Sequence, residues 1–179
     1  MTQKRKNFIG LAFSLGIMLF FSLSCTTKPT SSDAVPTTTT GLLVSATTSA
    51  PGGQYAPSNI VAIWITDNSD KFVKTLYVKA AQRITHLNKW KSVSASNTID
   101  AATGATRLGH GTIYATWDGT DVSKKVVADG TYKVWMEMTD AASAGAFTSF
   151  NFVKGAAAQT ITPADGAHFS GITSSWMPL

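Results

Sequence analysis

A short segment that ends at Thr106 carries side chains suited to accepting a covalently attached group. It reads Asp-Ala-Ala-Thr-Gly-Ala-Thr from Asp100 to Thr106. A threonine hydroxyl is a weak nucleophile, so its modification requires an outside base. Gly104 and Ala105 minimise side-chain bulk beside that hydroxyl and allow close approach. The surrounding residues 95–111 are polar and rich in Gly, Ser and Thr, which predicts an exposed loop whose turn Asp100 could shape by accepting backbone N–H groups.

This segment resembles the flavinylation signal Asp-x-x-(Ser/Thr)-Gly-Ala-Thr at every specified position, Thr103 included. In the FMN-carrying subunits of sodium-pumping NADH:quinone oxidoreductase and of Rnf complexes, an external flavin transferase attaches FMN to the last threonine. The resemblance implies FMN on Thr106 through a phosphoester, with a flavin transferase as the maturation partner. Arg107 would then be placed to screen the phosphate charge, and Trp90 could stack on the isoalloxazine. The alternatives are an ordinary Gly-containing loop and ordinary packing of Trp90.

A wider series of motifs runs from Ile60 to Asp140. It begins with Val-Ala-Ile-Trp-Ile at 61–65, continues through the Thr106 segment, and ends with Trp-Asp-Gly at 117–119 and Gly-Thr-Tyr at 130–132. The series resembles the predicted periplasmic family catalogued as domain of unknown function 2271, which has been linked to flavinylation. This resemblance implies electron transfer outside the cytoplasm, with a membrane or periplasmic redox partner.

The other polar residues of the sequence give weaker indications of function. The three histidines, His86, His110 and His168, lack metal-ligand spacing, and no Gly-x-Ser-x-Gly nucleophile elbow is present. Three aspartates beside Gly-containing turns could bind Ca²⁺, but turn capping is the preferred interpretation; they are Asp118, Asp121 and Asp129. Cys25 is the single cysteine, which excludes an internal disulfide and a thiolate metal cluster. We expect no metal site.

The elements that would position the Thr106 segment are mostly strands. β-Branched and aromatic runs predict strands at 42–48, 60–66, 72–78, 112–117, 132–138, 147–153 and 169–177, and residues 157–162 are ambiguous. Residues 67–70 predict a hairpin turn. One short helix is predicted at about 86–94, capped by Thr85, with Leu87 and Trp90 on one face. The predicted fold is an all-β, immunoglobulin-like antiparallel sandwich, and residues 112–139 resemble the immunoglobulin-like domain of the flagellar hook-capping protein.

The N-terminal residues predict export. Lys4, Arg5 and Lys6 precede an apolar run that ends near Cys25, which is typical of a lipoprotein signal peptide over 1–24 with Cys25 lipidated. The alternative is an ordinary cleaved signal with an incidental cysteine. Residues 25–40 predict a disordered Thr/Ser/Pro tether, and 41–179 a single folded domain.

Charge argues against nucleic acid as a partner. The formal net charge is +5, and loss of the signal peptide with its three basic residues lowers it to +2. The sequence therefore favours a membrane-tethered extracytoplasmic flavoprotein that carries electrons and has no substrate pocket of its own. The alternative is a non-catalytic immunoglobulin-like envelope module that binds protein or glycan. A small hydrolase is the third and least favoured class, because no nucleophile–base pair stands out.

Overall fold

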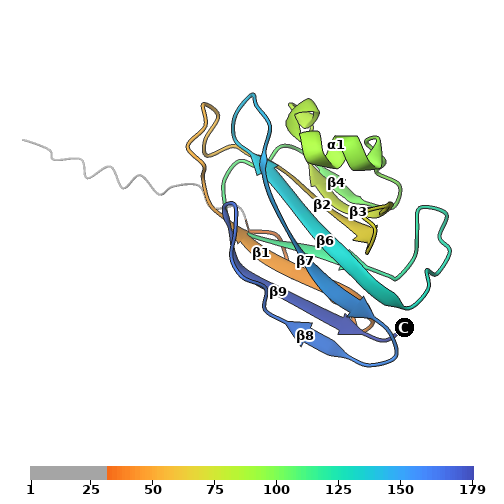
Figure 1. The fold of residues 1–179 in the computed structure, drawn as a ribbon. Coiled ribbons are helices and arrows are strands. Elements are labelled where there is room, and N and C mark those ends of the chain that lie inside the picture. Colours follow the sequence, from red (N-terminus) through yellow and green to blue (C-terminus); the bar gives the residue numbers. More distant parts are fainter. Residues whose placement is uncertain (1–31) are drawn as a thin grey trace, which may run out of the picture.

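The computed structural model describes residues 32–179. The predicted signal peptide and Cys25 lie outside these residues. The described chain is a sandwich of two β-sheets with one short α-helix (Figure 1). The first sheet has the order β5-β1-β9-β8 and contains β1 (Gly41–Thr48), β5 (Thr112–Trp117), β8 (Gln159–Ile161) and β9 (Phe169–Met177). The second has the order β4-β3-β2-β6-β7 and contains β2 (Ile60–Asp67), β3 (Phe72–Lys79), β4 (Ala102–Gly104), β6 (Gly130–Thr139) and β7 (Ala146–Lys154).

The predicted mostly-β sandwich is confirmed, and the seven strands predicted from β-branched runs all form. The ambiguous stretch 157–162 contains the short strand β8. Pairing between the described strands is antiparallel except between β3 and β4, which run parallel. The prediction of an exposed loop at 95–111 missed β4, the strand that carries the Thr106 segment.

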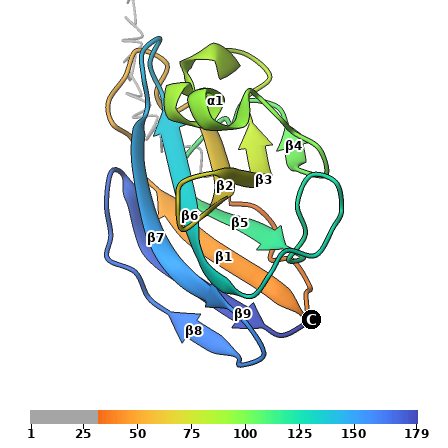
Figure 2. The same ribbon diagram turned by 45° about the vertical axis from the view of Figure 1, so that its right-hand side comes forward.

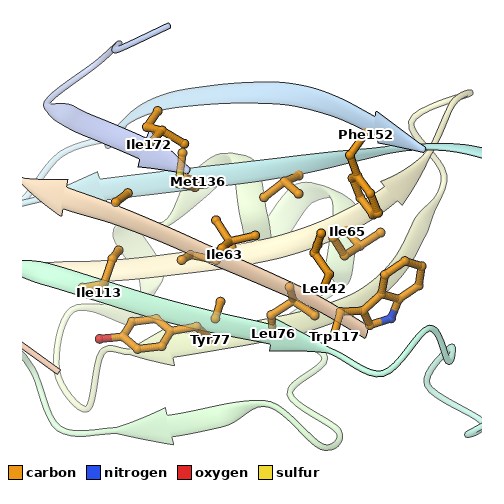
Figure 3. Close-up of a cluster of buried hydrophobic side chains, with 14 of the residues drawn as sticks. Leu42, Ile63, Ile65, Leu76, Tyr77, Ile113, Trp117, Met136, Phe152 and Ile172 are labelled. Atoms are coloured by element: carbon orange, nitrogen blue, oxygen red, sulfur yellow. The ribbon is translucent and has the colours of Figure 1, made fainter. Parts of the chain in front are cut away.

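Strand β2 is buried on both faces because apolar residues occupy nearly every position. Ile63 and Ile65 point inward, where the two sheets enclose the main core with Leu42, Trp117, Met136 and Phe152 (Figure 3). Trp64 points outward into a second apolar cluster beneath the helix, together with Leu87 and Trp90. Successive strand residues face opposite sides, so a continuous apolar run fits a central strand covered on both faces.

The hairpin turn between β2 and β3 forms as predicted. Asp67 accepts hydrogen bonds from the backbone N–H groups of Ser69 (2.8 Å) and Lys71 (3.0 Å) through one carboxylate oxygen. Asp70 has φ of 63°, a left-handed conformation that Asp tolerates better than most residues.

Helix α1 (Asn88–Ser94) lies against β2 and β3 on the face away from the first sheet (Figure 1). The predicted cap is wrong, because Thr85 lies in a preceding 3₁₀ turn, Ile84–His86. The side chain of Glu137 on β6 caps the helix instead, accepting from the backbone N–H groups of Lys89 (3.1 Å) and Trp90 (2.8 Å). Burial raises the pKa of Glu137, while the hydrogen bonds from the helix oppose the shift.

Residues 32–40 contain no helix or strand, but the domain begins before residue 41. The backbone N–H of Asp33 donates to the carbonyl of Thr112 at 2.9 Å. Its carboxylate accepts from the Tyr77 hydroxyl at 2.7 Å and from Arg107 Nη1 at 3.2 Å, and lies 3.6 Å from Lys79 Nζ. The end of the tether predicted over 25–40 is therefore part of the folded unit at Asp33.

Candidate functional site

The middle of the Thr106 segment forms the edge strand β4. Ala102, Thr103 and Gly104 pair with Tyr77, Val78 and Lys79 of β3, and both strands run in the same direction (Figure 2). All three residues of β4 are exposed. The nearest atoms to a Cβ added at Gly104 would be those of the flexible side chain of Lys79, with its Cδ at 3.1 Å. The open side of β4 therefore presents both backbone and small side chains to a modifying enzyme.

The hydroxyl of Thr106 is held just beyond the end of β4. Its Oγ1 accepts a hydrogen bond from the backbone N–H of Gln82 at 3.3 Å. The next residue, Arg107, forms two backbone hydrogen bonds of 3.0 Å with Asn59, in an isolated antiparallel bridge. Gln82 follows β3 and Asn59 precedes β2, so backbone from two other elements fixes the position of Thr106.

Thr106 lines a pocket of about 500 Å³ where three loops meet. That volume lies within the range of about 300–1,000 Å³ typical of small-molecule sites. The loop before β2 contributes Tyr55 and Ser58, the loop after β3 contributes residues 81–83, and the segment after β4 contributes Ala105, Thr106 and Leu108. No carboxylate is among these lining residues of the described chain, and Arg83 is their charged member.

Arg83 was not predicted as a site residue. Its Cζ lies 4.1 Å from the centroid of the Tyr55 ring, within the range of a cation–π contact. Its Nη1 is buried without a hydrogen-bond partner among residues 32–179. The backbone of Arg83 is left-handed, with φ of 63°. Sequence reasoning missed this residue because its loop meets Thr106 only in the folded structure.

The phosphate-screening role predicted for Arg107 is wrong. Its side chain is 1% exposed, and its Nη1 donates to Asp33 (3.2 Å) and to the Tyr77 hydroxyl (3.0 Å) between the sheets. Neighbouring residues of an extended segment point to opposite sides, so a side chain directly after Thr106 faces the interior. Burial, followed by the hydrogen bond to Asp33, raises the pKa of Tyr77, which keeps this hydroxyl protonated.

The stacking role predicted for Trp90 is also wrong. The side chain is 0% exposed and belongs to the cluster between α1 and the sheet. Its indole Nε1 donates to Thr75 Oγ1 at 3.0 Å. Trp90 is a core residue, in agreement with the alternative of ordinary packing.

Asp100 lies at the opposite end of β4 from Thr106. It adopts φ of 58° in a turn where the backbone N–H of Ala101 donates to the carbonyl of Thr98 at 3.1 Å. Its carboxylate lies 3.8 Å from Lys74 Nζ and 3.6 Å from Lys124 Nζ. The two ends of the motif therefore lie in different surroundings, and Asp100 contributes to the turn through its left-handed backbone, while its carboxylate faces lysines.

The carboxylates of the three aspartates considered for Ca²⁺ binding accept hydrogen bonds from neighbouring groups of the protein. Asp121 accepts from the backbone N–H groups of Ser123 (2.8 Å) and Lys125 (3.1 Å), as turn capping predicts. Asp118 accepts from Thr120 and Lys74, and Asp129 from Lys154. Within residues 32–179, no group of three or more His, Cys, Asp or Glu side chains is arranged to hold a metal ion.

A family described as "predicted periplasmic protein (DUF2271)" matches residues 44–168, well over half of the chain. The chain belongs to this family. The prediction of DUF2271 membership is confirmed, and the match includes every residue that lines the Thr106 pocket. No curated protein and no solved structure matches the chain. Among the helices of residues 32–179, none has the length and apolar character needed to span a bilayer.

Proposed function

We propose that this DUF2271 protein is a membrane-tethered, extracytoplasmic flavoprotein that carries FMN on Thr106 and transfers electrons. The observation that supports the proposal most directly is the placement of Thr106. The last threonine of a flavinylation-like signal is partly exposed, beside small residues, in a pocket with a basic side chain and no carboxylate among its described lining residues. These residues fit a phosphate-linked group.

The attachment step follows from the chemistry of the signal. A flavin transferase presents FAD, and the Thr106 Oγ–phosphorus bond forms while the pyrophosphate bond breaks. AMP leaves, and the hydroxyl proton passes to a base of the transferase. The protein gains the mass of FMN minus one water. Once attached, FMN supplies the redox chemistry through its isoalloxazine, while the protein sets its exposure and surroundings.

The folded domain supports this role through rigidity. The Asn59–Arg107 bridge fixes the backbone on one side of Thr106, and pairing of β4 with β3 fixes it on the other. The exposed edge of β4, directly before the partly exposed Thr106, offers another protein a surface on which to approach the acceptor. A lipid on Cys25 and a tether that extends to about residue 32 would keep the domain near the membrane, where it can reach donor and acceptor proteins.

The test is co-expression of the full chain, in exported form, with a flavin transferase that modifies a known acceptor. The wild-type protein should give a fluorescent band on a denaturing gel and gain FMN minus one water in mass. Thr106→Ala should abolish both signals, and Thr106→Ser should retain part of the labelling because it keeps a hydroxyl nucleophile. Thr103→Ala should weaken the labelling less than Thr106→Ala, since Thr103 is an exposed threonine of the same signal whose hydroxyl is not the acceptor.

An unlabelled wild-type protein beside a labelled known acceptor would refute the proposal. The non-catalytic envelope module would then be the better interpretation of this sandwich.

A further inference from the structure

The described residues that line the pocket beside Thr106 include one basic side chain, Arg83, and no carboxylate. A partnerless guanidinium nitrogen in a buried position costs free energy, and so does a left-handed backbone at a residue other than glycine. Within residues 32–179, Arg83 shows both features, in the pocket that contains the predicted acceptor hydroxyl. Two unfavourable features at one residue indicate that a ligand completes the site.

The position of Thr106 identifies which part of the ligand would come closest to Arg83. A phosphate esterified to Thr106 Oγ1 has to lie beside that oxygen, which the backbone N–H of Gln82 already contacts. Arg83 is the next residue in the chain and lines the same pocket. The planar guanidinium matches phosphate oxygens in a two-pronged arrangement, which a lysine ammonium cannot reproduce.

Tyr55 positions this guanidinium from the other side of the pocket. Its ring lies 4.1 Å from Arg83 Cζ, and its backbone N–H donates to the carbonyl of Asp140 at 2.9 Å. The Asp140 carboxylate also accepts from the N–H groups of Gly52 (3.1 Å) and Gly53 (3.0 Å). A Cβ at Gly53 would lie 2.6 Å from the Asp140 carbonyl oxygen, so this close approach requires glycine. The loop that carries Tyr55 is therefore fixed to the end of β6.

We propose that Arg83 binds the phosphodiester that links FMN to Thr106, and that Tyr55 positions Arg83 for this contact. The proposal rests on the proposed function, because the phosphate is that of the attached FMN. Before attachment, the same guanidinium would contact the incoming pyrophosphate of FAD. Arg83 would thus assist the attachment and afterwards immobilise the linkage.

The experiment compares the wild-type protein with Arg83→Gln, Arg83→Lys and Tyr55→Leu, all as full-length chains. Gln and Lys keep the left-handed strain at position 83, since neither is glycine. Lys125→Gln is the control, because Lys125 is an exposed cation in the loop that follows the far end of β5. Circular dichroism establishes that each variant keeps its β structure.

The first measurement is the rate of FMN attachment by purified transferase with FAD. Loss of a charge-assisted hydrogen bond corresponds to a rate loss of about tenfold or more. Arg83→Gln should show that loss, Arg83→Lys and Tyr55→Leu should lie between it and the wild type, and Lys125→Gln should match the wild type.

The second measurement is the ³¹P resonance of the linkage in protein whose labelling has been verified by mass. In the wild type, its chemical shift should differ from that of the same protein in denaturant. In Arg83→Gln, the chemical shift should move most of the way to the value of the denatured protein. An unchanged resonance in Arg83→Gln would overturn the proposal, and a slower attachment rate alone would assign Arg83 to contact with the transferase. If the wild type takes up no FMN, the proposed function itself fails, which is a distinguishable result.

Discussion

The anchoring of α1 by Glu137 leads to a quantitative prediction for Glu137→Ala. The 3₁₀ turn and α1 directly follow the loop that carries Gln82 and Arg83, so the helix anchor also secures one wall of the Thr106 pocket. Glu137 is 1% exposed and accepts the backbone N–H groups of Lys89 and Trp90. The alanine variant leaves both donors without this acceptor.

The magnitude follows from these two hydrogen bonds. A buried donor left without a partner costs about 1–3 kcal/mol. The Trp90 N–H is buried and should give the full cost, whereas the Lys89 N–H is partly buried and should recover part of its loss through water. Removing the desolvated carboxylate returns some stability, because burial disfavours its charged form. We expect Glu137→Ala to lower the free energy of unfolding by about 2–3 kcal/mol.

Urea denaturation followed by tryptophan fluorescence measures this change. Ser92→Ala is a suitable control, since its hydroxyl donates to the carbonyl of Lys89 on the exposed side of the same helix, and it should change stability by less than about 0.5 kcal/mol. A Glu137→Ala protein as stable as the wild type would show that the carboxylate does not anchor the helix.

Two further predictions concern pH and the membrane anchor. Burial raises the pKa of Glu137 in the folded state above its ordinary value of 4.5. The protonated side chain therefore contributes stability that is fully present below pH 4.5. This stability is lost as the pH rises through the folded-state pKa. The wild type should therefore lose stability relative to Glu137→Gln as the pH rises above 4.5, and a constant difference between the two unfolding curves would contradict the shift. Cys25→Ala should abolish both labelling by a palmitate analogue and partition into the detergent phase of Triton X-114, whereas unchanged labelling would exclude Cys25 as the lipidation site.

The strands of the sandwich could be predicted because their own side chains determine them. The β-branched and aromatic run of β2 and the aspartates of its hairpin turn indicate the same structure locally and globally. By contrast, β4 contains only Ala102, Thr103 and Gly104, and it becomes a strand because β3 offers it backbone partners. Local residue types carry no information about that pairing.

The site could be predicted only in part, and the reason is related. Thr106 was found because its motif is contiguous in sequence, whereas Tyr55 and Arg83 reach it from separate loops. The cap of α1 was misassigned because its acceptor, Glu137, comes from a distant strand. The orientation of Arg107 was the one error that sequence could have avoided, since a residue adjacent to a surface threonine in extended chain faces the opposite side.

Peptide mass mapping of protein purified from its native host tests the central claim most directly. Cleavage after Lys91 and Arg107 by trypsin gives a peptide, residues 92–107, that contains Thr106. We expect this peptide to carry FMN minus one water, with fragmentation that places the added mass on Thr106. Recovery of the same peptide only in unmodified form, from cells whose other flavinylated proteins carry FMN, would contradict the account.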